Sequence, residues 1–347
     1  MSPAPAAPSA ARASSPSRAA NPNRFLNDSR DVVFVRLCAA ITLVQLPCAI
    51  ALFVVENVTW WLAAGYWLLW GCLFMDRYIL MLHATAHRPL FRREWRFLNR
   101  YIPWVIGPFC GETPESYFAH HLGMHHKEEN LSDDLSSTMP YRRDSFRHWL
   151  RYFLRFLLLC LPELVMYLLR KRRQRLAYRV AVGELAFWAA VLVLGHWVSW
   201  EATLVVLVAP VVVVRTLMMI GNWGQHAFVD PAAPANSYRN SITCINTRYN
   251  RRCFNDGYHI VHHLTPGLHF TEMALEFEQN QRAYGEQDAI VFDGIDFFGV
   301  WWCLMTKRWR TLVRRFVHLP GAPPRDDAQV LALLRSRLLP ISEPASV

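Results

Sequence analysis

The sequence predicts an all-α membrane protein with four transmembrane helices, additional interfacial helices and a histidine-rich cap on the cytoplasmic side. Three features lead to this fold class: long apolar runs, Lys and Arg at the ends of those runs, and histidines spaced one helical turn apart. The chain has 347 residues, 53% of them hydrophobic, and its 37 Lys and Arg against 27 Asp and Glu give a net charge of +10. On so apolar a chain, a basic balance indicates a surface that faces anionic lipid, and we expect no nucleic-acid partner.

The two ends of the chain differ in composition from the part between them. Residues 1–30 are rich in Ala, Ser and Pro and contain no acidic residue before Asp28, so we expect a disordered N-terminal tail. The Arg and Ser content also fits an organelle transit peptide, but a segment without an apolar core is not a secretory signal. We expect residues 31–320 to form one membrane domain and residues 321–347 to form a C-terminal tail.

Five apolar runs are candidate membrane crossings, because a helix needs about 20 apolar residues to span the bilayer. They cover roughly residues 33–55, 57–75, 150–169, 181–199 and 202–220. The third run is basic at both ends, because Arg147 precedes it, RKRRQR follows it, and Arg151 and Arg155 lie within it. Since Lys and Arg favour the cytoplasmic side, we expect this run to lie in the interface or to re-enter, which leaves four crossings.

Four crossings place both termini and every clustered histidine on the cytoplasmic side. The two outer loops, ENVT and SWEA, then contain no Lys or Arg, in agreement with the positive-inside rule. Asp76 and Arg215 precede His83 and Asn222 by seven residues, so we expect the second and fourth helices to extend about 10 Å beyond the hydrocarbon. The sequence thus predicts a metal site just below a bacterial inner membrane or an ER membrane, with an organelle membrane as the alternative.

Four histidine clusters recur along the chain at helical spacing. In HATAH, His83 and His87 are four residues apart, so both imidazoles can reach one metal from one helix face. We expect His121 and His125 of HLGMHH to repeat this arrangement, with His126 reaching a second metal. The expected metal-binding residues are His83, His87, His121, His125, His126, Asn222, His226, His259, His262 and His263. Nine imidazoles exceed the capacity of one ion and, without thiolates, suit iron, copper or zinc.

Other polar residues near the clusters have more ordinary explanations. His120 lies five residues from His125, which points away from a shared helix face, so we favour His121 as the ligand. No direct metal contact is assigned to His148, His196, His269 and His318. Four carboxylates either hydrogen-bond the ligand imidazoles or belong to solvated loops: Glu128, Asp133, Asp134 and Asp256. The eight scattered cysteines are expected to be reduced core residues.

The order of these clusters resembles that of the membrane fatty acid desaturase and hydroxylase superfamily. HATAH, HLGMHH and HIVHH are similar to its three histidine boxes, and NWGQH is similar to the asparagine and extra histidine after the fourth membrane helix of stearoyl-type acyl-CoA desaturases. The resemblance covers roughly residues 33–270 and is specific to the superfamily, not to one reaction. It implies a non-haem centre of two Fe ions that uses O₂ as co-substrate to oxidise C–H bonds of a lipid or fatty acyl chain.

The resemblance also implies an external source of electrons. The chain lacks the HPGG motif of a fused cytochrome b5 domain, so a separate donor is expected. A ferredoxin, a rubredoxin or a cytochrome b5 would be attracted by the basic cytoplasmic face.

Several reactions are open to such a centre, and we expect desaturation of an acyl chain. Hydroxylation, decarboxylation of a free fatty acid to a terminal alkene, and carotenoid oxidation are the alternatives within the superfamily. Decarboxylation needs a cation for the carboxylate, and Arg248, Arg251 and Arg252 are candidates, although such a run more often faces lipid. From another class, a metal transporter or a zinc-dependent membrane hydrolase is the alternative.

Overall fold

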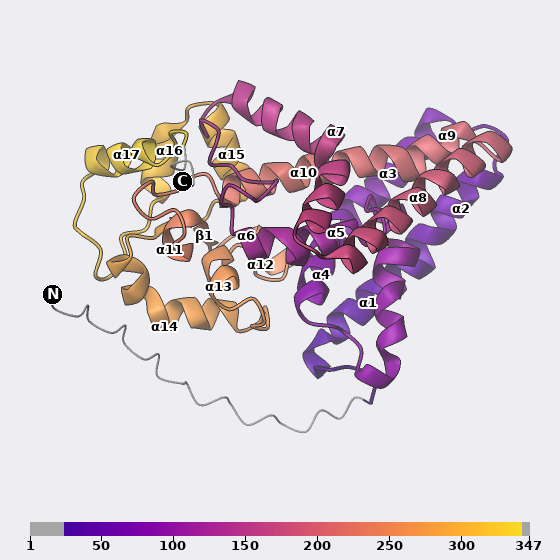
Figure 1. Ribbon diagram of the computed structural model, residues 1–347, viewed down its shortest axis with the longest axis horizontal. Helices are drawn as coiled ribbons and strands as arrows, with labels where there is room; N and C mark the ends of the chain where they lie inside the picture. Colours follow the sequence, from indigo (N-terminus) through magenta and orange to yellow (C-terminus); the bar gives the residue numbers. More distant parts are fainter. Residues whose placement is uncertain (1–23, 342–347) are drawn as a thin grey trace.

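The computed structural model describes residues 24–341, and nearly all of its regular structure is helical (Figure 1). Most of the expected N-terminal tail, residues 1–23, lies outside the described residues, as do residues 342–347. Residues 24–30 pack on the folded body, since Leu26 is 1% exposed and forms an isolated antiparallel bridge with Phe91.

Four helical segments are long and apolar enough to cross a membrane, which confirms the predicted all-α membrane fold. Three of them match expected crossings: Ser29–Val54, Gln174–Trp197 and Trp200–Gln225. The first comprises η1 (Ser29–Asp31), α1 (Val32–Ala40), the π-helix η2 (Ile41–Gln45) and α2 (Leu46–Val54), and the second is α8. The third comprises α9 (Trp200–Thr203), the π-helix η7 (Leu204–Val208) and α10 (Ala209–Gln225).

The fourth segment is α7 (Phe146–Arg170), the run that we expected in the interface. The expected crossing at 57–75 instead forms α3 (Trp60–Leu73), which ends at Phe74 before α4 (Met75–His87) begins. With 14 residues, α3 alone covers about 21 Å and falls short of a hydrocarbon core of about 30 Å. Figure 1 shows α7 beside α10, away from the end where α2, α3, α8 and α9 gather. The interfacial placement of α7 stays a prediction.

The surface of the long helices is apolar. Leu43, Leu68 and Leu185 are between 67% and 74% exposed. Tryptophans are exposed beside both loops that we expect on the outer side: Trp60, Trp61, Trp197 and Trp200. Aliphatic exposure on this scale suits lipid rather than water, and tryptophan concentrates at membrane interfaces.

Shorter elements form the cap. Between α4 and α7 lie η3 (Arg93–Arg100), η4 (Ile102–Ile106), η5 (Pro108–Cys110), α5 (Ser116–His120), η6 (His121–His125) and α6 (His126–Glu128). After α10 follow α11 (Ser237–Asn240), β1 (Ile242–Ile245), α12 (Arg248–Arg252), α13 (His259–Leu264), α14 (Met273–Glu286), β2 (Ile290–Asp293), α15 (Phe297–Met305), α16 (Trp309–Arg315) and α17 (Asp327–Ser336). The two strands pair in parallel, with Ile242 opposite Ile290, and enter a core shared with α15, α16 and α17.

Helix α17 lies in the segment that we expected to be a C-terminal tail. Its Val330 and Leu334 are fully buried, so part of this segment belongs to the folded body. The buried guanidinium of Arg143 fixes the chain beyond the helix, because it donates hydrogen bonds to the carbonyl oxygens of Arg337 (2.9 Å) and Leu339 (2.7 Å).

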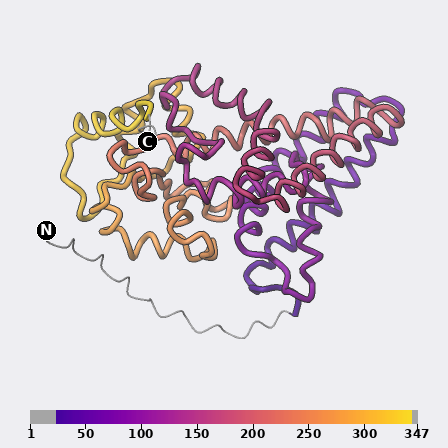
Figure 2. Tube along the Cα trace, in the orientation of Figure 1, coloured from indigo at the N-terminus to yellow at the C-terminus, as the bar shows by residue number. Residues whose placement is uncertain are grey.

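The histidine-bearing segments converge where the long helices meet the cap. Figure 2 shows the purple chain around residues 83–126 and the orange chain around residues 259–263 approaching each other at the middle of the molecule. Close packing of α8 supports this region: a Cβ at Gly183 would lie 2.1 Å from the carbonyl oxygen of Pro114, so only glycine permits the approach.

Candidate metal centre

Five imidazoles form a first group at this junction. His83 and His87 of α4, His121 of η6, His126 of α6 and His262 of α13 place one ring nitrogen each within 4.8 Å of one another. Three Nε2–Nε2 distances are 2.9 Å: from His83 to His262, from His87 to His121, and from His126 to His262. The first group therefore draws its nitrogens from three separate parts of the chain.

Four imidazoles form a second group beside the first. The ring nitrogens of His125, His226 and His263 lie within 4.8 Å of one another. His259 joins them, because its Nε2 lies 3.3 Å from that of His226 and 3.0 Å from that of His263. Neighbours in sequence are divided between the groups, since His126 and His262 belong to the first while His125 and His263 belong to the second.

This division corrects one expected pairing. We expected His121 and His125 to share a metal, but His121 lies with His126 in the first group. The reason is local: residues His121–His125 form a π-helix, and the His126 N–H bonds to the His121 carbonyl oxygen. A π-helix bonds residue i to i+5, so residues five apart share its face instead of residues four apart.

Oxygen partners at Nδ1 set the direction of the lone pairs in three of the rings, through hydrogen bonds in His125 and His226 and through a nearby carboxylate in His83. The Nδ1 of His125 lies 2.7 Å from the Asp134 Oδ2, and that of His83 lies 3.2 Å from the Asp256 Oδ1. The His226 Nδ1 donates to the Asn240 carbonyl oxygen over 2.9 Å. A proton held at Nδ1 leaves Nε2 with a free lone pair directed at the other rings, as in histidines that bind metals.

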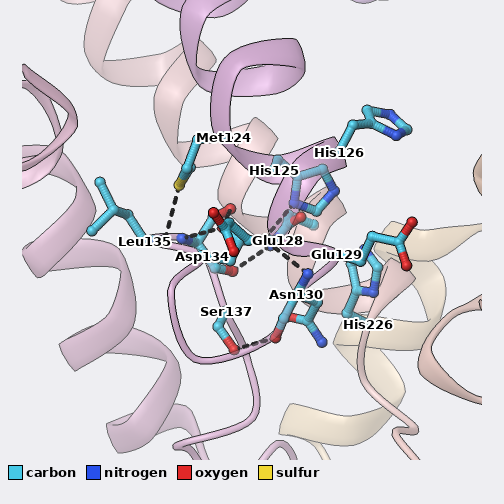
Figure 3. A network of polar contacts seen from close by, with 12 residues as sticks. Met124, His125, His126, Glu128, Glu129, Asn130, Asp134, Leu135, Ser137 and His226 are labelled. Atoms are coloured by element: carbon cyan, nitrogen blue, oxygen red, sulfur yellow. Dashed lines mark hydrogen bonds and ion pairs between the residues drawn. The ribbon is translucent and has the colours of Figure 1, made fainter. Parts of the chain in front are cut away.

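Asp134 is held as firmly as the ring that it orients (Figure 3). Its Oδ2 also accepts the Asn130 N–H (3.0 Å), and its Oδ1 accepts the N–H (2.8 Å) and the hydroxyl (2.6 Å) of Ser136. Burial alone would raise the pKa of Asp134, but the adjoining His125 and these hydrogen bonds lower it below its usual range. The carboxylate therefore stays ionised and keeps the His125 proton at Nδ1.

Burial also keeps the imidazoles neutral. Burial, together with neighbouring imidazoles, lowers the pKa of His87 to about 3 and that of His226 to about 4. The same causes lower the pKa of His121, His259, His262 and His263. Neutral imidazole is the form that binds a metal.

The arrangement fits two metal ions. Two ligands at right angles, each about 2.1 Å from one ion, have nitrogens about 3.0 Å apart, and the Nε2–Nε2 distances in the two groups run from 2.9 to 3.3 Å. Mutual hydrogen bonds cannot satisfy all the rings, because the Nε2 atoms of His83 and His126 both approach the His262 Nε2. An imidazole set without thiolates suits iron, copper or zinc.

Asn222 is placed differently from the histidines. Its Nδ2 donates hydrogen bonds to the Ser136 carbonyl oxygen (2.9 Å) and to the Tyr152 hydroxyl (2.7 Å). The residue lines a cavity together with His125 and His259, and its amide oxygen is not engaged in these two hydrogen bonds.

The structure also separates the remaining sequence candidates. His120 lies outside both groups, its ring against Phe156, and His269 bonds to Asp31. Of the four candidate carboxylates, Asp134 and Asp256 approach ring nitrogens, whereas Glu128 and Asp133 pair with Lys171. All eight cysteines are free thiols, as expected, but Cys48 and Cys72 are exposed and so do not belong to the core.

Sequence reasoning missed the support behind His226. The side chain of Asn240 donates to the Glu129 carbonyl oxygen (2.6 Å), and the Thr138 hydroxyl donates to the His226 carbonyl oxygen (2.7 Å). The loop after the second histidine cluster thereby ties α10 to α11. The group that orients the His226 ring is a backbone carbonyl, which leaves no signature in a sequence.

An apolar cavity of about 340 Å³ reaches both imidazole groups. It touches His83 and His121 of the first group and His125 and His259 of the second. Its apolar wall consists of residues from α4, α10 and α15: Met75, Ile79, Leu80, Leu217, Met218, Met219 and Phe298. A slender apolar molecule in this cavity would lie against both groups at once.

Comparison with known proteins agrees with this geometry. No curated protein and no solved structure gives a significant match to the chain. The family model described as "Fatty acid desaturase" matches residues 59–294, which include all four histidine-bearing segments and most of the cap. The chain therefore belongs to the fatty acid desaturase family.

Proposed function

We propose that the protein is a membrane-bound di-iron desaturase that inserts a double bond into the acyl chain of a lipid, with O₂ as oxidant and a separate protein as electron donor. The family supports an O₂-dependent oxidoreductase that acts on lipid. The observation that carries the proposal is the apolar cavity that touches both imidazole groups. A saturated –CH₂–CH₂– unit, O₂, two electrons and two protons would give –CH=CH– and two molecules of water.

The ten predicted residues would hold the two irons. The first group would bind one ion through five imidazoles and the second group would bind the other through four, with the Asn222 amide oxygen or a water completing the second sphere. Bound there, the irons would supply the activation of O₂ and the abstraction of hydrogen from carbon. Neutral donors leave the charge of the ions uncompensated, unlike carboxylate-bridged di-iron bundles.

The protein's own residues would position the chain and exclude water. The methionine, leucine and isoleucine side chains of the cavity would hold an acyl chain in extended form against the rings. Asp134, Asp256 and the Asn240 carbonyl would keep the ring nitrogens aimed inward while the substrate enters and leaves.

The charges around the cavity favour an internal double bond over decarboxylation. Among the described residues that line it, Asp76 and Asp256 are acidic and none is a lysine or an arginine. Arg252 reaches the rim but forms an ion pair with Asp76, and Arg248 and Arg251 are exposed. The lining therefore offers no cationic side chain to hold a free carboxylate in the position that decarboxylation needs.

The proposal extends to the orientation in the membrane. With α3 and the start of α4 as the second crossing, and with α7 in the interface as its basic ends favour, both termini and the metal centre would lie in the cytoplasm. Tags at residues 140 and 176 should both react with cytoplasmic reagents. Exclusive reaction of residue 176 from the outer side would show that α7 crosses the membrane.

The reaction can be tested directly. Membranes containing the chain, a ferredoxin, rubredoxin or cytochrome b5 system and a panel of lipids should yield acyl chains of unchanged length with one internal double bond, identified by gas chromatography and mass spectrometry. A shortened terminal alkene or a hydroxylated chain as the main product would overturn desaturation and leave the di-iron assignment standing. Stoichiometric zinc without lipid oxidation would favour the hydrolase alternative.

A further inference from the structure

Glu112 is a buried carboxyl group close to the metal centre that the preceding account leaves without a role. It lies between η5 and α5, is 5% exposed, and has no hydrogen-bond partner at Oε1. A buried carboxyl oxygen without a partner is costly, so such an atom calls for an explanation.

Glu112 and His120 line one small cavity together with polar and apolar side chains. It has a volume of about 20 Å³ and is lined by Glu112, Ser116, Tyr117, His120 and Arg215 among others. His120, which lines this cavity, likewise has a buried ring nitrogen, Nε2, without a hydrogen-bond partner. A cavity of this size holds one water, and two unpaired polar atoms with a guanidinium nearby would satisfy its hydrogen bonds.

This small cavity lies between two larger ones. On the side that faces solvent, Glu112 lines a cleft of about 600 Å³ with Arg96 and Arg100, both of which are exposed. We call this cleft the outer cleft because it opens to the molecular surface, not because of its side of the membrane. On the inner side, His120 and Tyr117 line the cavity that touches both imidazole groups. Glu112 and His120 thus connect the molecular surface to the centre through one water-sized space.

The charges around Glu112 allow it to exchange a proton near neutral pH. The pKa of Glu112 is raised to about 7, chiefly by burial; the guanidinium of Arg215 on α10 opposes this rise, the carboxylate of Glu184 on α8 adds to it, and Ser116 opposes it by hydrogen bonding. Arg215 lies 3.6 Å from Glu184 and so already has an acidic partner. Burial raises the pKa of Tyr78 on α4 and of Tyr117 on α5, so both phenols are uncharged in that range. The thiol of Cys160 on α7 also lines the small cavity.

We propose that Glu112, through an ordered water held between its carboxyl group and the His120 ring, delivers protons from the outer cleft to the metal centre. This inference rests on the proposed function, because forming two waters from O₂ consumes two protons per double bond. Glu112 would give its proton to the water, the water would pass one on to the inner cavity, and the carboxylate would regain a proton from the cleft. The electrons come from the separate donor protein, and His120 only accepts a hydrogen bond.

The test compares Glu112→Gln with Glu112→Asp and with Glu94→Gln, an exposed glutamate on η3 that serves as control. Glu112→Gln should keep its iron but lose about 10²-fold in turnover, the scale of general acid catalysis. It should also lose the pH dependence near 7 and release hydrogen peroxide, because O₂ that has received two electrons without proton delivery at the centre would leave it and take its two protons from bulk water. Glu112→Asp should restore part of the turnover, and Glu94→Gln should match the wild type.

A second measurement needs neither iron nor turnover. The iron-free wild type should show an infrared carbonyl band of a protonated carboxylic acid at about pH 5 that disappears by about pH 9. This band should be absent from Glu112→Gln. Normal coupled turnover in Glu112→Gln, or an unchanged band, would overturn the inference alone. Absence of lipid oxidation in wild type and variants alike would overturn the proposed function instead.

Discussion

The two imidazole groups stand side by side but are built differently. In the second group His125, His226, His259 and His263 are all buried, at most 8% exposed, and two of the four rings have an oxygen partner at Nδ1. In the first group His87 and His126 are only half-buried, and one ring of five has a carboxylate at Nδ1. The second group is therefore the more rigid and the first the more accessible, and the two sites should differ in how firmly they hold metal.

The largest effect is expected from removing one imidazole from either group. His226→Ala in the second group and His262→Ala in the first should each abolish turnover, because the acyl chain must meet both ions. His148→Ala and His318→Ala should be nearly neutral, since both rings lie outside the groups. The amount of desaturated product measures the turnover of each variant. Full activity in His226→Ala would show that His226 is not needed for turnover and would contradict a catalytic role for the second group.

A smaller effect should distinguish the two supporting carboxylates. Loss of a group that orients a metal-bound imidazole typically costs about 10–100-fold in metal affinity or activity. The loss in Asp134→Asn should be near the upper end of this range, because Asp134 is 2.7 Å from the His125 Nδ1 and is fixed by three further hydrogen bonds. Asp256→Asn should cost less, because its distance from the His83 Nδ1 is 3.2 Å. Metal titration of both variants measures which one loses more metal affinity. A larger loss in Asp256→Asn than in Asp134→Asn would contradict the proposed difference between the two groups.

A chelator should remove the two ions in sequence. Since His87 and His126 are half-buried and the second group is enclosed, the first group should lose its ion first. Iron remaining on the protein after timed dilution into chelator should fall in two phases of similar amplitude. The slow phase should become fast in Asp134→Asn but not in Asp256→Asn. A single phase in the wild type would show that the groups bind metal equally.

The smallest effect is expected at Asn222. Its amide nitrogen is anchored to Ser136 and Tyr152, so only the amide oxygen is available to the second ion. Asn222→Asp should retain metal and part of the turnover, whereas Asn222→Leu should lower turnover without releasing the ion held by four imidazoles. Loss of that ion in Asn222→Leu would assign the residue a larger share of the binding.

The sequence predicted those parts of the centre that depend on regular helices. His83 and His87 lie in one group because α4 is an ordinary α-helix from Met75 to His87. His121 and His125 do not, because a π-helix changes the residues that share a face, and this departure from α-helical geometry has no signature in HLGMHH.

Other features depended on contacts between distant segments. Asp134 and Asp133 are adjacent and chemically alike, yet one holds His125 and the other pairs with Lys171. Only the folding of the loop decides between them. The apolar run at 57–75 gave no sign of the break at Phe74, which divides it from the helix that carries the first two histidines.

The most direct test of the central claim is the metal content of the purified chain and of one variant in each group. Elemental analysis and Mössbauer spectroscopy of wild type loaded with ⁵⁷Fe should give about two irons per chain in two distinguishable sites, as two imidazole groups require. His226→Ala should lose the signal of the more enclosed site, and His262→Ala should lose the other. A single iron signal lost equally in both variants, or one zinc per chain, would contradict a centre built from two groups.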